Sequence, residues 1–69
     1  MMKLQDYLFH NVILTDMDNT QWKGHVFSFH DAEDNEDNED NENSITLKIS
    51  DNKNLIEFTE SEIKSIKIA

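Results

Sequence analysis

The clearest hydrophobic pattern in the chain is an alternation of apolar and polar residues between positions 44 and 49. Ile45, Leu47 and Ile49 fall on one face, and the residues between them are polar. A period of two is typical of a β-strand with one buried face. After a short polar turn, the segment LIEFT (residues 55–59) repeats the alternation. This half of the pattern predicts two strands joined by a tight turn.

The first part of the chain predicts a short helix and two more strands. Residues 3–10 space their apolar side chains at i, i+3 and i+4, which favours one or two turns of amphipathic helix. Residues 11–15 (NVILT) are β-branched and apolar, and residues 21–30 (QWKGHVFSFH) form a longer predicted strand. Gly24 inside the longer strand predicts a bulge or a sharp bend there.

The C-terminal residues predict a fifth strand. Glu60, Ser61 and Glu62 break the alternation, which favours a single 3₁₀ turn, and the segment KSIKIA (residues 64–69) follows. Closure removes exposed strand edges, so the sequence predicts a mainly β, five-stranded, strongly bent antiparallel barrel with a short N-terminal helix. The side chains predicted to face its core are Val12, Leu14, Val26, Ile45, Leu47, Ile49, Ile56, Phe58, Ile66 and Ile68.

The charge of the chain is concentrated between the second and third predicted strands. The chain has 69 residues, enough for a single domain, and carries 15 acidic residues against six lysines. Eight of the acidic residues lie within positions 31–43, where the triplet Glu-Asp-Asn repeats. This stretch has no large apolar side chain that could offset the cost of ordering it. We therefore predict a disordered acidic loop at residues 31–43.

Composition narrows the classes of function. The absence of cysteine excludes disulfides and thiolate metal sites, and no signal sequence or apolar run of 18 residues is present. We therefore expect a cytoplasmic protein with no membrane partner. The chain has no arginine, its six lysines are scattered in sequence, and its net charge is −9. These features disfavour nucleic acid as a partner, because phosphate neutralisation needs clustered cations.

The segment VILTDMDNT contains a D-x-D-x-T pattern at Asp16, Asp18 and Thr20. The same pattern holds the nucleophile and the acid of haloacid-dehalogenase-like phosphatases. That chemistry requires a parallel sheet with long, usually helical crossovers, and no later segment has a helical period of that length. Asp and Asn side chains also form turns by bonding nearby backbone groups. We therefore predict the corner of a β-hairpin, no catalytic residues and no enzymatic activity.

Metal and cofactor sites are not predicted. A calcium-loop spacing that starts at Asp31 includes Glu33, Asn35 and Glu42, but Glu36 stands where such a loop needs glycine. This match indicates weak, non-selective attraction of cations rather than a specific site. His25 and His30 differ by five positions, so a regular strand would place them on opposite faces. No cofactor is expected.

The order of the predicted elements resembles an Sm-like (LSM) or SH3-like small β-barrel. The resemblance is carried by NVILTD (residues 11–16), GHVFSFHD (24–31), SITLKI (44–49) and IEFTESEIKSIKI (56–68). Asp31 falls one residue later than the first Sm motif requires. The RNA-binding Ile-Arg-Gly-like triplet of the second motif is replaced by ESEIKSI. The segment EFTESEIKSIKI is also similar to small uncharacterised proteins of Gram-positive bacteria and their phages.

This resemblance implies a non-enzymatic interaction or assembly module, since Sm-like barrels form rings through edge strands of neighbouring subunits. We expect a homo-oligomer with Phe27 and Phe29, or the last two strands, at the interface. An alternative is an acidic phage-type protein that binds a basic protein partner or mimics nucleic acid; RNA binding by analogy of fold is less favoured. The residues expected to take part in interactions are Phe27, Phe29, Asp34, Glu36, Asp37, Glu39 and Asp40.

Overall fold

A computed structural model describes residues 3–32 and 42–69, which form a mainly β structure. Residues 33–41, which make up most of the predicted disordered acidic loop 31–43, lie outside the described residues. The elements are the 3₁₀ helix η1 (Leu4–Tyr7), the strands β1 (Asn11–Asp16), β2 (Gln21–His30), β3 (Ser44–Ile49) and β4 (Leu55–Thr59), the 3₁₀ helix η3 (Glu60–Glu62), and the strand β5 (Ile63–Ile68).

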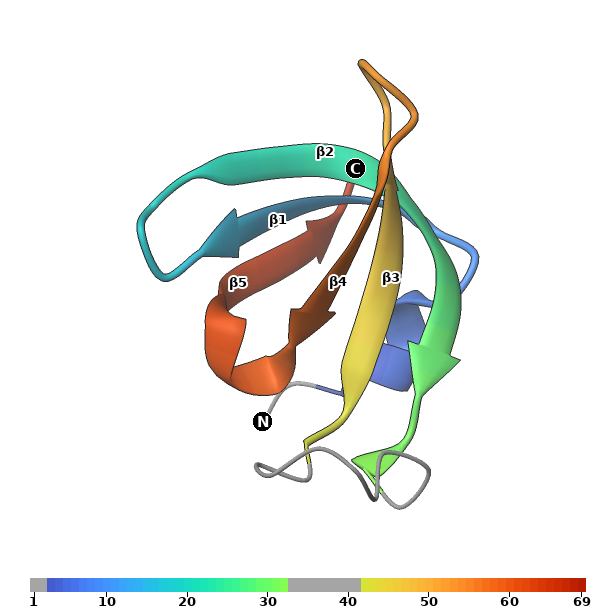
Figure 1. Cartoon of the computed structure of the whole chain (residues 1–69), viewed down its shortest axis with the longest axis vertical. Coiled ribbons are helices and arrows are strands. Elements are labelled where there is room, and N and C mark those ends of the chain that lie inside the picture. Colours follow the sequence, from blue (N-terminus) through green and yellow to red (C-terminus); the bar gives the residue numbers. More distant parts are fainter. Residues whose placement is uncertain (1–2, 33–41) are drawn as a thin grey trace.

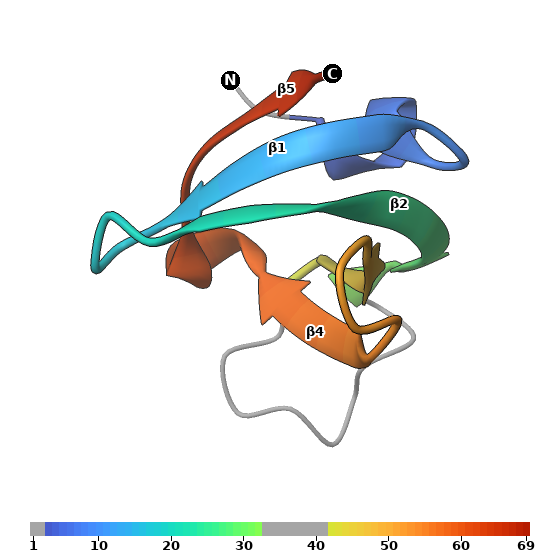
Figure 2. The same cartoon turned by 90° about the horizontal axis from the view of Figure 1, so that it is seen from above.

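The five strands form an antiparallel sheet in the order β4-β3-β2-β1-β5. Each strand pairs in antiparallel fashion with its neighbours in this order, and β2 is the central strand. Figure 1 shows β2 curving from β1 towards β3, and Figure 2 shows β5 and β4 on opposite sides of the molecule. Within the described residues β4 and β5 are not paired, so the sheet is bent but open.

The core lies on the concave face of the sheet and largely confirms the predicted set. Leu4 from η1 joins it with only 1% of its surface exposed, since η1 packs against β2 and β3. The one or two helical turns expected here are a single 3₁₀ turn, and Phe9 soon afterwards has a left-handed φ of 66°. The buried apolar residues are Leu4, Val12, Leu14, Val26, Ile45, Leu47, Ile49, Phe58, Ile63 and Ile66.

The sequence suggested a bulge or a sharp bend at Gly24, but the bulge in β2 is at Phe27. The β2–β3 register shifts between Val26 and Ser28, which leaves Phe27 as the extra residue. The shift brings Phe29 opposite Ile45, where it packs, partly buried, against the core. Phe27 remains 45% exposed. The two phenylalanines therefore separate, because one extra residue reverses the facing of every residue beyond it.

Gly24 has a different role, which is to allow β3 to approach β2 closely. It pairs in regular register with Val12 on one side and Ile49 on the other. A Cβ atom at this position would lie 2.4 Å from the carbonyl oxygen of Lys48 and 3.0 Å from Cγ of Leu47. No side chain fits at such distances from backbone atoms.

The two edge strands, β4 and β5, correct two assignments of the predicted core. Ile68 is 54% exposed, although it pairs with Val12, because β5 has a neighbour on one side and is open on the other. Ile56 on β4 is half-buried for the same reason. A register shift between Thr15 and Asp16 instead turns Ile63 inward, where it is 5% exposed. Both edge strands thus contribute less to the core than strict alternation predicts.

The burial of the leucines gives a matched test of the core. Leu47 is fully buried and Leu55 is 55% exposed, although they lie on neighbouring strands. We expect Leu47→Ala to lower the free energy of unfolding by about 2–5 kcal/mol, because it leaves a cavity. Leu55→Ala should change it by less than about 0.5 kcal/mol. Urea denaturation of the two variants measures the difference, and equal effects would contradict the assigned facing of β3.

Replacement of Gly24 tests the close approach of the two central strands. We expect Gly24→Ala to destabilise the fold by about 1–3 kcal/mol or more, because the obstructing atom is a backbone oxygen that cannot rotate away. Ser65→Ala, at an exposed position of β5, serves as the control. A Gly24→Ala variant as stable as wild type would show that the strands do not need this contact.

Candidate functional site

The D-x-D-x-T segment forms the turn of the β1–β2 hairpin, as predicted. Oδ1 of Asp16 accepts hydrogen bonds from the backbone N–H groups of Asp18 and Thr20, each at 2.9 Å. The backbone N–H of Asp16 donates to the carbonyl of Thr20 at 2.9 Å, and Asn19 adopts a left-handed φ of 67°. These are the local bonds that make Asp and Asn favourable in turns.

The second oxygen of the Asp16 carboxylate is also engaged. Its Oδ2 accepts a hydrogen bond from Nε1 of Trp22 at 2.9 Å. This bond, followed by those from the Thr20 and Asp18 N–H groups, lowers the pKa of Asp16 below its ordinary value despite some desolvation. The carboxylate is thus held ionised by three donors that fix the turn against the start of β2.

A second ordered turn, η3, lies between β4 and β5, where the sequence predicted a 3₁₀ turn. Oε1 of Glu62 accepts hydrogen bonds from the backbone N–H and the hydroxyl of Thr59, both at 3.0 Å. Glu42, from the far side of the acidic stretch, accepts hydrogen bonds from the Ser61 N–H at 2.8 Å and the Ser61 hydroxyl at 2.9 Å. The segment that leads into β3 is thereby tied to η3.

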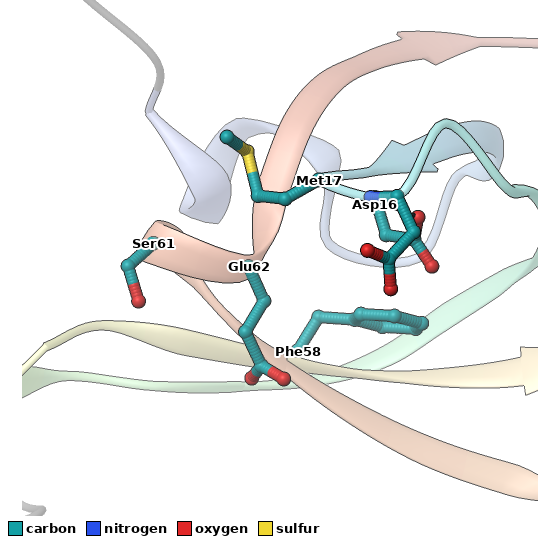
Figure 3. Close-up of a pocket in the computed structure, with 6 residues that line it drawn as sticks. Asp16, Met17, Phe58, Ser61 and Glu62 are labelled. Atoms are coloured by element: carbon teal, nitrogen blue, oxygen red, sulfur yellow. Dashed lines mark hydrogen bonds between the residues drawn. The ribbon is translucent and has the colours of Figure 1, made fainter.

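The hairpin turn and η3 together border a surface pocket of about 330 Å³, hereafter the acidic pocket. Figure 3 shows Asp16 and Met17 on the side of the hairpin turn, Ser61 and Glu62 on η3, and the ring of Phe58 below Asp16. That ring packs against Trp22, with centroids 5.8 Å apart at an interplanar angle of 57°. The lining residues are Asp16, Met17, Asp18, Phe58, Ser61 and Glu62.

The chemistry of the acidic pocket favours a cationic group with an aliphatic stem. Three carboxylates carry its charge, and Phe58 and Met17 provide apolar contact; Met17 is 61% exposed. A lysine or arginine side chain combines both properties. Among residues 3–32 and 42–69 no cluster of three or more histidine or acidic side chains is arranged to hold a metal ion.

The two edge strands are the other candidate for a functional surface. In the part of the chain that the structure describes, β4 pairs with β3 alone and β5 pairs with β1 alone. Each edge strand also exposes a large apolar side chain, Leu55 on β4 at 55% and Ile68 on β5 at 54%. Open edges with apolar side chains are surfaces on which another strand can add.

The structure describes few of the residues proposed from sequence. Phe27 is exposed and Phe29 packs against the core. Of the suggested calcium residues, Asp31 is exposed and Glu42 accepts hydrogen bonds from Ser61. The other sequence-based site residues lie outside the described residues; they are Glu33, Asp34, Asn35, Glu36, Asp37, Glu39 and Asp40.

Sequence reasoning missed the acidic pocket because its two halves are 40 or more positions apart. One local signal was available: Thr59 followed three residues later by Glu62 is the spacing of a capping interaction. It indicated an ordered turn but not its proximity to Asp16.

The prediction that the two histidines of β2 face opposite sides was also wrong. Because the bulge at Phe27 lies between them, His25 and His30 fall on the same side of β2.

Comparison with known proteins gives no match to a family model, a curated sequence or a solved structure. No helix in the described part of the chain is long and apolar enough to cross a membrane.

The Asp16 turn generates a pH-dependent prediction. Asp16→Asn can still accept the two backbone bonds, but its amide nitrogen cannot accept from the Trp22 indole, so we expect a lower Tm at neutral pH. The folded pKa of Asp16 is depressed, so its contribution is present above the unfolded pKa and is lost as the pH falls through the folded one. The Tm difference between wild type and Asp16→Asn should therefore shrink on acidification.

Thermal unfolding followed by fluorescence of Trp22, the single tryptophan, measures this difference at each pH. Asp18→Asn is the matched control, because only its backbone N–H takes part in the turn bonds. It should leave Tm nearly unchanged throughout. A constant gap between Asp16→Asn and wild type from neutral to acid pH would contradict the role of the ionised carboxylate.

Proposed function

We propose that this chain is a non-enzymatic assembly module of the Sm-like or SH3-like small-barrel type, which forms homo-oligomers by pairing of edge strands. The observation that carries the proposal is the pair of open edges on β4 and β5. An open edge presents unpaired backbone N–H and C=O groups, which pair favourably with another strand. In a second copy of the chain the complementary strand is always available.

The charges on the two edge strands support contact between unlike edges. Lys64 and Lys67 lie on β5, which has no acidic residue, whereas β4 contains Glu57 and no lysine. Two β4 edges or two β5 edges would place like charges together, which costs free energy. A contact between β4 of one copy and β5 of the next avoids that repulsion. Such a head-to-tail contact builds rings or filaments.

The resemblance to the Sm-like pattern supports the same proposal. The short N-terminal helical turn, the glycine in the curved second strand and three further strands follow the element order of that barrel. The replacement of its RNA-binding triplet by residues 60–66 favours assembly over RNA binding. The absence of enzymatic activity is supported by Asp16, whose carboxylate is already engaged by three donors in the turn.

A second candidate function is the binding of a basic protein partner, and the acidic pocket favours it. Its three carboxylates belong to a chain with a net charge of −9, which would attract a basic surface over a distance of about 8–10 Å at moderate ionic strength. Edge pairing remains the better supported function, because it needs no partner beyond the chain itself.

Edge pairing is tested by a charge placed on the exposed side chain of β5. We expect wild type to be oligomeric at high micromolar concentration by light scattering coupled to size-exclusion chromatography. Ile68→Asp should shift it towards monomer without lowering Tm appreciably, because Ile68 is 54% exposed. The control is Met17→Asp, which introduces the same charge at a 61% exposed position in the β1–β2 turn.

Two results would overturn the edge-pairing proposal. A wild-type chain that remains a strict monomer at high micromolar concentration would exclude assembly. An oligomer that Ile68→Asp and Met17→Asp leave equally intact would show that the contact does not use the β5 edge.

A further inference from the structure

The register of the sheet gathers lysines that are scattered in the sequence. Ile13 pairs with Lys23 on β2 and with Lys67 on β5, so these three residues form one row across the sheet. In the next row that faces the same way, two residues further along the strands, Lys48 pairs with both His25 and Leu55. Paired residues share a face of the sheet. Because the alternate residues Val12, Gly24 and Leu47 are buried, these two rows lie on the outer face.

Three of the six lysines of the chain, Lys23, Lys48 and Lys67, therefore share one surface, hereafter the basic face. All three side chains are exposed. With neighbouring strands about 4.8 Å apart, they lie within roughly 15 Å of one another. Among residues 3–32 and 42–69, none of the three ammonium groups has a hydrogen-bond or ion-pair partner.

Acidic side chains are absent from these two rows of described residues. The nearest on β4 is Glu57, which pairs with Thr46 in the next row. Its Oε2 accepts a hydrogen bond from the hydroxyl of Ser44 at 2.8 Å, which draws the carboxylate away from Lys48. Asp51, in the β3–β4 turn, is accompanied by Lys53 in the same turn. The basic face thus keeps its positive charge in a chain that is strongly acidic overall.

We propose that the basic face docks the acidic stretch, residues 31–43, of a second copy of this chain. This inference rests on the proposed assembly function and names a second contact within it. The stretch carries eight carboxylates and no lysine, so the two surfaces are complementary in charge. A nucleic acid fits less well, because the chain has no arginine for bidentate phosphate contacts.

The length of the acidic stretch favours a second copy over the same chain. The stretch leaves β2 after His30 and enters β3 at Ser44, whereas Lys23 lies seven residues back along β2. A return path from His30 to Lys23 and back to Ser44 covers roughly 43 Å along the strands. Thirteen residues span at most about 43–47 Å when fully extended. The stretch of the same chain can reach Lys48, four residues after Ser44, but can reach Lys23 only when fully extended, so contact with the whole basic face favours a second copy.

The test measures binding of a fluorescent synthetic peptide of residues 31–43 to the full-length chain. We expect saturable binding that weakens steeply with added salt, since the attraction is between exposed charges. The double variant Lys23→Gln/Lys48→Gln should weaken binding by about tenfold, from the loss of two exposed ion pairs. The control Lys3→Gln/Lys64→Gln removes the same charge from exposed positions outside the two rows and should leave binding unchanged.

Several outcomes would overturn the inference. One is that the peptide does not bind, and another is that both double variants weaken its binding equally. A third is that a peptide with every Asp and Glu replaced by its amide binds as tightly as the acidic peptide. A fourth is that oligothymidylate binds more tightly than the peptide. The Ile68→Asp variant separates this inference from edge pairing. If the Ile68→Asp variant still binds the peptide, the result supports the basic face independently of edge pairing. If Ile68→Asp loses its oligomers and the full-length chain does not bind the peptide, edge pairing is supported and the basic-face contact is excluded.

Discussion

The close approach of β3 to β2 at Gly24 is the constraint on which the other features of this small sheet depend. The carbonyl oxygen of Lys48 lies where a side chain at position 24 would have to begin, so the two central strands can be packed this closely only with glycine. That contact fixes the register at Val26 and Leu47, both fully buried. Beyond it, the extra residue Phe27 reverses the facing of β2 and brings Phe29 to the core. Gly24 and the extra residue Phe27 together therefore determine which residues of β2 face the core.

The same register determines the surface. Once Val12, Gly24 and Leu47 face inward, Lys23 and Lys48 must face outward, and Lys67 joins them through Ile13. The carboxylates collect elsewhere, because the β1–β2 turn and η3 meet beside Phe58 at another part of the molecule. Charges that look evenly scattered in the folded part of the sequence are thus sorted by the pleat into a basic face and an acidic pocket.

Local rules recovered much of this fold from sequence, and non-local geometry accounts for what they missed. The hairpin turn at Asp16 and the 3₁₀ turn before Ile63 were predictable, since their bonds join residues four or fewer positions apart. The alternation in β3 was predictable because β3 itself is regular, and the extra residue in its pairing with β2 lies on β2. The bulge at Phe27 and the exposure of Ile68 depend on which strand lies alongside, and periodicity does not carry that information. The acidic pocket and the basic face were missed for this reason too.

The separation of positive and negative surfaces changes how a net charge of −9 affects the association of two copies of the chain. A uniformly acidic surface would make two copies repel each other at all orientations, and the scattered lysines of the sequence suggested little relief. Because screening limits exposed charges to about 8–10 Å at moderate salt, a neighbouring copy responds to the nearest surface and not to the total. The lysines of β5 and of the basic face then present local attraction to acidic groups, while acidic surfaces that meet each other are repelled. In the proposed assembly, the sorting of charge by the sheet would favour contact between unlike surfaces, as an ordered head-to-tail arrangement requires.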